Sequence, residues 1–220
     1  MKPKALVSWS GGKDCMLALR HTHRAFDIVA LLTTVTREFR RISMHGVRVE
    51  LLQRQAESVR IPLRMVEIPH PCSNAIYEQA MKDVWAEAQL QGVTAVICGD
   101  LFLADVRRYR EERLFGAQGC VFPLWHRPTC EIAREFIGLG FHAVLCCVDT
   151  QILPADFAGR AYDDALLRDL PASVDPCGEN GEFHTFVHAG PLFETPIAFE
   201  CGERVLREER FSYCDLLPIQ

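Results

Sequence analysis

The 220-residue chain lacks several features that would assign it to common classes of protein. Its ten cysteines include no C-x-x-C pair, which leaves a zinc ribbon or a dithiol centre without support. No run approaches about 18 consecutive apolar residues, and the apolar run that follows residues 1–4 is too short for a signal peptide. The net charge of −5 lacks the positive excess of a broad nucleic-acid-binding surface. We therefore expect a cytoplasmic protein with reduced thiols that binds neither membrane nor nucleic acid.

Two glycine-rich nucleotide-binding patterns are also missing. A Walker A loop needs a glycine five residues before Gly12 and a serine or threonine after Lys13, but Val7 and Asp14 stand there. No G-x-G-x-x-G pattern lies nearby, so a Rossmann dinucleotide site has no support. What is present is S-W-S-G-G-K-D-C at residues 8–15, directly after a short apolar run. This segment predicts the end of a strand, then a loop of small residues, then the start of a helix. Such a loop can hold a phosphate through its N–H groups and the positive end of the helix.

The first 125 residues alternate short apolar runs with longer amphipathic segments, which is typical of a parallel sheet covered by helices. We expect strands at 5–9, 28–34, 63–68 and 95–99, and helices near 14–24, 47–59, 74–90 and 104–117. The third helix carries one wide apolar stripe that we expect to pack in the core. The stripe comprises Ile76, Tyr77, Ala80, Met81, Val84, Trp85 and Ala88.

Prolines break the chain into shorter pieces after residue 122, which predicts a second unit. We place a boundary near residue 125, between a nucleotide-binding domain at 1–125 and a smaller α+β substrate-binding domain at 126–220. A helix at 130–137 and strands at 143–148 and 184–188 are readable there. Residues 149–183 are rich in loop signals, and long ordered loops often carry function.

Ligands of open α/β sheets bind beyond the carboxyl ends of the strands, and candidate residues follow several of the predicted strands. Lys13 can neutralise phosphate charge, and Ser10 can donate a hydrogen bond. Asp14 is a candidate Mg²⁺ ligand, although it also suits the positive helix end. The expected nucleotide-binding residues are Ser8, Ser10, Gly11, Gly12, Lys13, Asp14, Cys15, Thr33, Thr34, Met44, His45, Gly99 and Asp100.

The most polar candidate segment is residues 175–185, where glycines bracket Glu179 and Asn180 before Glu182 and His184. Burying such a loop is costly without ligands or dense hydrogen bonding, although a plain surface turn is the alternative interpretation. The expected catalytic residues are Lys13, Asp14, Glu179, Asn180, Glu182 and His184, with Glu182 or His184 as general base. The expected substrate-binding residues are Arg107, Arg108, Gly178, Glu179, Gly181 and Thr185; for the two arginines, a solvated helix face with paired charges is equally open.

Together these segments resemble the diphthine–ammonia ligase family, a branch of the ATP pyrophosphatases with the adenine nucleotide α-hydrolase fold. The loop at 10–14 resembles the family's phosphate loop, and Met44-His45 resembles its nucleotide-side loop. The segment 178–185, G-E-N-G-E-F-H-T, resembles the signature Gly-Glu-Gly-Gly-Glu-Tyr/Phe-Glu-Thr. Asn180 stands for a glycine, His184 for a glutamate and Cys15 for a serine. This form resembles the bacterial branch, in which no diphthamide pathway is expected.

The resemblance implies an ATP-dependent amide ligase that uses ATP and Mg²⁺. Such an enzyme activates a substrate carboxylate as an acyl adenylate, releases AMP and pyrophosphate, and amidates the acyl group with ammonia. The carboxylate belongs to a small molecule or a protein side chain, and a homodimer is left open. Two alternatives keep the fold: a tRNA-modifying enzyme of the thiolation type, and an ATP-binding module without ligase activity.

Overall fold

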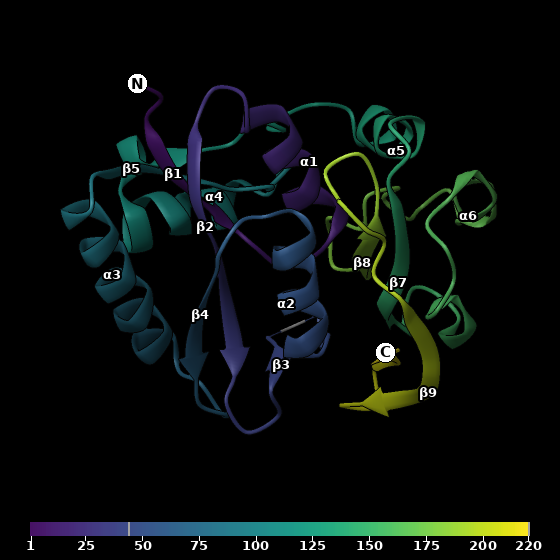
Figure 1. The fold of residues 1–220 in the computed structure, drawn as a ribbon. Helices are drawn as coiled ribbons and strands as arrows, with labels where there is room; N and C mark the ends of the chain where they lie inside the picture. The colour runs from purple at the N-terminus through teal and green to yellow at the C-terminus, as the bar shows by residue number, and fades with distance from the viewer. Residues whose placement is uncertain (44, 220) are drawn as a thin grey trace.

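The structure, a computed structural model, describes residues 1–43 and 45–219. Its first half contains a six-stranded sheet in which β4, β2, β1, β5 and β6 run parallel (Figure 1). Short β3 pairs with the end of β2 in the antiparallel direction. This arrangement confirms the expected parallel α/β sheet. The bounds are β1 Lys4–Ser8, β2 Asp27–Thr36, β3 Arg41–Ile42, β4 Leu63–Ile68, β5 Val93–Ile97 and β6 Cys120–Val121.

Helices cover both faces of this sheet because its central strands are apolar on both sides. Alternate residues of β1 show the division: Ala5 and Val7 belong to the cluster that includes α1 and α2, whereas Leu6 packs in the cluster with α3. The bounds are α1 Lys13–Thr22, α2 Val49–Ser58, α3 Asn74–Leu90 and α4 Ala104–Tyr109, which continues into the π-helix η1 Arg110–Phe115. Each expected helix is therefore present.

The apolar stripe of α3 differs in detail from the prediction. Met81, Trp85 and Ala88 are buried as expected, but Ile76 is 48% exposed. Glu78 takes a buried position on the helix instead, because Arg113 of η1 binds its carboxylate at 2.9 Å. A charged residue can therefore occupy the covered face where a partner from another element compensates its desolvation.

The second half is built on an antiparallel sheet in the order β8-β7-β10-β9 (Figure 1). The sequence predicts β7, β8 and the helix α5, but it does not predict β9, β10 or α6. The bounds are α5 Thr129–Gly138, β7 His142–Asp149, α6 Asp164–Asp169, β8 Phe183–Ala189, β9 Phe199–Arg207 and β10 Phe211–Pro218. Short 3₁₀ turns lie at Ala117–Gly119 and Ala155–Phe157.

The two sheets share one hydrophobic core, with α1 and α2 lying between them (Figure 1). Leu17 of α1 and Leu52 of α2 belong to the same buried cluster as Phe136 and Phe186 of the second half. Polar contacts also cross the junction: Asp215 of β10 binds Arg41 at 2.9 Å and Arg48 at 2.6 Å. Asp215 thereby joins β10 to β3, which pairs with the end of β2, and to the start of α2.

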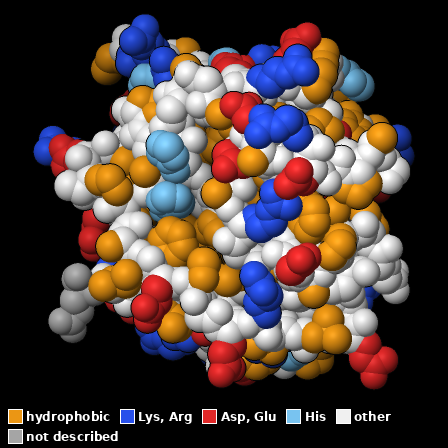
Figure 2. Space-filling view, turned by 90° about the vertical axis from the view of Figure 1, so that its right-hand side faces the viewer, with side chains coloured by type: hydrophobic (Ala, Val, Ile, Leu, Met, Phe, Trp, Pro, Cys, Tyr) orange, Lys and Arg blue, Asp and Glu red, His pale blue; other side chains and the backbone are white. Residues whose placement is uncertain are grey.

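Within the described ranges, no helix has the length and apolar character needed to cross a membrane. On the face that the second half presents, Lys and Arg side chains are interspersed with Asp and Glu (Figure 2). This face therefore does not form one continuous basic surface.

Candidate active site

A cavity of about 310 Å³ opens between the carboxyl ends of β1, β2 and β5 and the loop before β8. It brings together residues predicted from both halves of the chain. The predicted residues that line it are Ser8, Ser10, Gly12, Lys13, Asp14, Cys15, Thr33, Thr34, His45, Gly99, Asp100, Gly178, Glu179, Gly181, His184 and Thr185. Gly11, Arg107, Arg108, Asn180 and Glu182 do not line it. Met44 falls outside the described residues.

The loop between β1 and α1 is shaped by two consecutive glycines. Gly11 has a left-handed φ of +76°, a region that glycine enters at little cost. Gly12 then caps α1, and the backbone N–H of Lys13 donates to Thr185 Oγ1 at 3.1 Å. The start of α1 therefore rests directly on β8, the strand that carries the end of the 178–185 signature.

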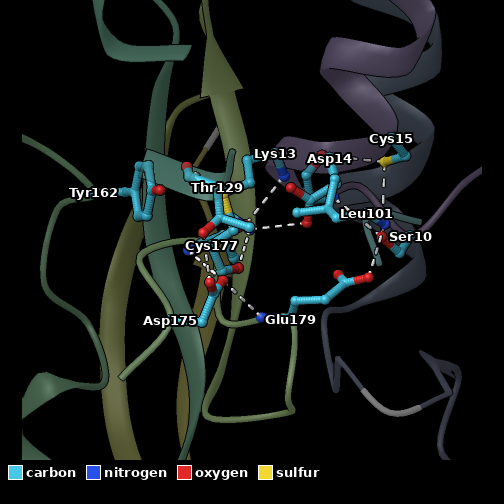
Figure 3. Close-up of polar contacts among 12 residues, drawn as sticks. Ser10, Lys13, Asp14, Cys15, Leu101, Thr129, Tyr162, Asp175, Cys177 and Glu179 are labelled. Atoms are coloured by element: carbon cyan, nitrogen blue, oxygen red, sulfur yellow. Dashed lines mark hydrogen bonds and ion pairs between the residues drawn. The ribbon is translucent and has the colours of Figure 1, made fainter. Parts of the chain in front are cut away.

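Lys13 is buried rather than extended into open space, with only 3% of its surface exposed. Its Nζ donates to Asp14 Oδ2 at 2.8 Å and to the carbonyl oxygen of Cys177 (Figure 3). The rings of Tyr162 and Phe183 lie 5.8 and 5.7 Å from the ammonium. Burial lowers the pKa of Lys13, but the charge of Asp14, its hydrogen bond with Lys13 and the neighbouring Cys177 and Glu179 together outweigh burial and hold that pKa above its usual value. Lys13 thus stays charged beside the cavity.

Three buried polar atoms on the cavity wall have no hydrogen-bond partner within the described part of the chain: Asp14 Oδ1, Thr33 Oγ1 and His45 Nδ1. Leaving such groups unpaired costs free energy, about 1–3 kcal/mol each. Burial also raises the pKa of Asp14, although Lys13 opposes the shift. The wall is therefore equipped to bind a polar ligand.

Two carboxylates hold the signature loop in shape from either end. Asp175 accepts from the backbone N–H of Cys177 at 2.8 Å and from Thr129 Oγ1 at 2.6 Å. Glu182 is 2% exposed and accepts from the N–H groups of Asp175 and Asn180, at 3.0 and 2.9 Å, and from Asn180 Nδ2. The structure therefore places Glu182 and Asn180 inside the loop's own hydrogen bonding, away from the cavity.

Glu179 is the carboxylate of this loop that reaches the cavity. It extends to the end of the first sheet, where its Oε1 accepts from the N–H of Leu101 at 2.8 Å (Figure 3). Burial raises the pKa of Glu179 from 4.5 to about 7, against the hydrogen bond from Leu101 and with the nearby charge of Asp14. A carboxyl group with this pKa can exchange a proton near neutral pH.

His184 stacks on His45 at a ring-centroid distance of 4.3 Å. Burial lowers the pKa of His184 to about 4, and the charge of Lys13 adds to the effect. Burial also lowers the pKa of His45 well below its usual value, and the neighbouring His184 contributes. At neutral pH both rings are therefore uncharged, and their nitrogen atoms can act as neutral hydrogen-bonding groups.

Several residues around the cavity were not predicted from the sequence. Arg110 of η1 lines it and forms an ion pair with Asp100 at 2.8 Å. Tyr77 and Met81 of the α3 stripe line it as well, so the stripe serves the cavity in addition to the core. The predicted Arg107 instead stacks between Phe122 and Trp125 and pairs with Glu111. Arg108 is exposed, which agrees with a solvated helix face.

The described residues include no group of three or more His, Cys, Asp or Glu side chains arranged to hold a metal ion. Of the carboxylates on the cavity wall, Asp14 lies in the first turn of α1 and Asp100 follows β5. Magnesium is commonly held by one or two carboxylates together with substrate phosphates, so a full protein cage is not required.

Comparison with known proteins gives a family match for each half of the chain. Residues 2–119 match the family model described as the diphthamide synthase N-terminal domain, and residues 128–216 match that of the diphthamide synthase C-terminal domain. A relative from Danio rerio named diphthine–ammonia ligase is 30% identical over 139 residues, which cover 60% of this chain. The match covers 52% of the relative, so the chain spans about half the length of this curated protein. The chain has a parallel α/β sheet and a cavity lined by both of its halves, and a diphthamide synthase family model matches each half. It therefore belongs to the diphthamide synthase family.

Proposed function

We propose that this chain is an AMP-forming, ATP-dependent amide ligase that activates a substrate carboxylate for reaction with ammonia. The observation that carries the proposal is the single cavity lined both by the glycine-rich loop at 10–14 and by the signature loop at 178–185. A ligase of this type must hold a nucleotide phosphate and an acceptor in one place, because positioning supplies much of its rate enhancement.

In the first step of the proposed reaction, an oxygen of the substrate carboxylate attacks the α-phosphorus of ATP. The bond from this phosphorus to the bridging oxygen breaks, pyrophosphate leaves, and an acyl adenylate remains. Negative charge builds up on the leaving pyrophosphate, where a buried cation is most effective. Lys13 is that cation: it is almost completely buried and kept charged by Asp14.

Asp14 and Asp100 fit a role in holding Mg²⁺ together with phosphate oxygens. Asp14 Oδ1 is buried without a partner among the described residues, as expected of an atom that binds a ligand. When bound, the ion would neutralise phosphate charge. Asp100 also forms an ion pair with Arg110 at the cavity wall.

In the second step, ammonia adds to the acyl carbon, loses a proton, and displaces AMP to give the amide. Glu179 is placed to orient the ammonia and to take up this proton, because it lines the cavity and its pKa is near 7. His184 and His45 stack on each other and contribute uncharged hydrogen-bonding groups, His184 to the acceptor and His45 to the nucleotide. Glu182 and Asn180 serve by keeping the loop that carries Glu179 in shape.

A Lys13→Ala variant tests the proposal. We expect AMP formation from ATP to fall by about 100-fold or more, the effect typical of removing one transition-state donor. The measurement is AMP release with ammonium and a cell extract as the source of acceptor. Lys2→Ala is the matched control, because Lys2 is exposed and does not line the cavity. AMP formation by Lys13→Ala at the wild-type rate would contradict the assignment.

A further inference from the structure

Gln55 is a buried amide on α2 that the proposed reaction does not use. It is 0% exposed, although it lies on a helix whose neighbouring Gln53 and Glu57 are exposed. Its Oε1 accepts from the indole Nε1 of Trp9 at 3.0 Å. Its Nε2 donates to the carbonyl oxygens of Gly11 at 2.9 Å and of Val187 at 2.6 Å. One side chain therefore joins the end of β1, the glycine-rich loop and β8.

The orientation of this amide is fixed by its partners. The indole of Trp9 can only donate, and the backbone carbonyls of Gly11 and Val187 can only accept. Oxygen must therefore face Trp9, and the NH₂ group must face the two carbonyls. A glutamate of the same shape could satisfy Trp9 but would present an oxygen to two other oxygens.

The carbonyl of Gly11 receives two donors, because Val187 N–H also donates to it at 2.9 Å. A peptide unit is planar and trans, so fixing the C=O of Gly11 also fixes the N–H of Gly12 in the opposite direction. Gly12 lines the cavity and Gly11 does not. Among the described residues, the N–H of Gly12 has only a long contact of 3.4 Å with Ser10 Oγ, which a stronger acceptor can replace.

We propose that Gln55 is a positioning residue that holds the Gly11–Gly12 peptide in one orientation, in which the N–H of Gly12 points toward the phosphate position in the cavity. We call this restraint by Gln55 the latch. Two consecutive glycines leave this peptide free to rotate, so the orientation needs an external restraint. A rotated peptide would direct its carbonyl oxygen at the phosphate and repel it. A glycine at position 11 leaves room for the side chain of Gln55, because a Cβ on Gly11 would lie only 2.8 Å from Gln55 Oε1.

This inference rests on the proposed function only in taking the cavity to bind a phosphate-bearing nucleotide. It predicts a selective defect: a variant without the latch loses affinity for phosphate groups but keeps its affinity for the nucleoside. A merely structural role of Gln55 would weaken both together.

The test is isothermal titration calorimetry of ATP, inorganic pyrophosphate and adenosine with the full chain and its variants. For Gln55→Glu we expect affinity for ATP and pyrophosphate to fall tenfold or more, with adenosine affinity unchanged within twofold. Gln55→Leu, which removes the donors without adding charge, should show the same selectivity and decides the matter if Gln55→Glu does not fold. Gln53→Glu is the matched control and should bind all three ligands as the wild type does.

Unchanged pyrophosphate affinity in both Gln55 variants would overturn the inference, as would equal losses for adenosine and pyrophosphate. The outcome is separable from that of the proposed function. A wild-type protein that binds ATP through this latch but never forms AMP would refute the ligase and leave the latch standing. A Gln55→Glu protein that forms AMP as readily as the wild type would refute the role of Gln55 alone. A wild-type protein that binds no phosphate ligand would overturn both the ligase and the role of Gln55.

Discussion

The ionisation of single side chains around the cavity is set by how deeply each is buried and by which charges face it. Lys13 remains charged because its neighbours, Asp14 foremost, offset its burial, whereas His184 becomes neutral because burial lowers its pKa and the charge of Lys13 adds to the effect. Glu179 falls between these cases, since burial raises its pKa to about 7 while one backbone N–H opposes the shift. The cavity therefore combines a permanent cation with a carboxyl group that can change its charge.

The raised pKa of Glu179 makes a prediction about stability. Between its ordinary pKa of 4.5 and about 7, the folded protein keeps a proton that the unfolded chain has released. The wild type therefore loses stability as pH rises through this window, by up to about 3 kcal/mol at 1.36 kcal/mol per pKa unit. Glu179→Gln cannot ionise, so its stability relative to the wild type should increase from pH 4.5 to 7.5.

Denaturant unfolding across this pH range measures the difference between the two proteins. Glu203→Gln on β9 is the control, because Glu203 is exposed, and it should follow the wild type at every pH. Parallel curves for Glu179→Gln and the wild type would show that Glu179 ionises in the folded protein as it does in the unfolded chain.

Some residues around the cavity could be predicted from the sequence, and others could not. The location of Ser10, Gly12 and Lys13 at the cavity could be predicted because it follows from local spacing along one loop. Gln55 and Arg110 could not, because a polar residue on an amphipathic helix ordinarily belongs to the solvated face. Their positions depend on partners from other elements: Val187 of β8 binds Gln55, and Asp100 after β5 pairs with Arg110.

At the scale of elements, the site depends on how closely the end of β5 approaches the start of α1. Gly99 follows β5, and a Cβ at this position would lie 2.7 Å from the carbonyl carbon of Asp14 and 2.8 Å from the N of Cys15. Both atoms belong to the backbone and cannot move without shifting α1. A residue without a side chain is therefore required where strand and helix meet at the cavity.

Gly99→Ala should destabilise the protein by about 1–3 kcal/mol, the usual cost of overpacking, and should weaken ATP binding because α1 is displaced. Gly138→Ala at the end of α5 is the control, because a Cβ there meets nothing within 4 Å. In a helix this change should be neutral or stabilising by up to about 1 kcal/mol. Thermal unfolding of both variants gives the comparison, and equal stabilities would contradict a close approach at Gly99.

The elements themselves were predicted unevenly for a physical reason. β1, β2 and β5 are largely apolar because helices cover both faces of the sheet at its centre. β4 instead alternates buried Val66 and Ile68 with exposed Met65 and Glu67, and either pattern produces a clear signal. In contrast, β9 is exposed along most of its length and carries charges of both signs, so its sequence lacks a buried face. In β10, Ser212 takes an inward position while Phe211 and Tyr213 remain partly exposed, which obscures the alternation.

At the scale of the whole molecule, the cavity exists because two sheets are held together around α1 and α2. The shared core, the contact of Lys13 with Thr185 and the binding of Arg41 and Arg48 by Asp215 all cross the same junction. The sequence predicts both halves but not this junction, because the contacts join residues more than 160 positions apart. The proposed ligase needs such a junction, since ATP would contact one half and the acceptor the other.

We propose that this cavity directs chemistry at the α-phosphate of ATP. The most direct measurement is the nucleotide product formed when the wild-type protein is incubated with ATP, Mg²⁺, ammonium and a cell extract. We predict AMP and pyrophosphate in equal amounts, together with an amidated product identified by mass spectrometry. ADP as the only nucleotide product would contradict the claim.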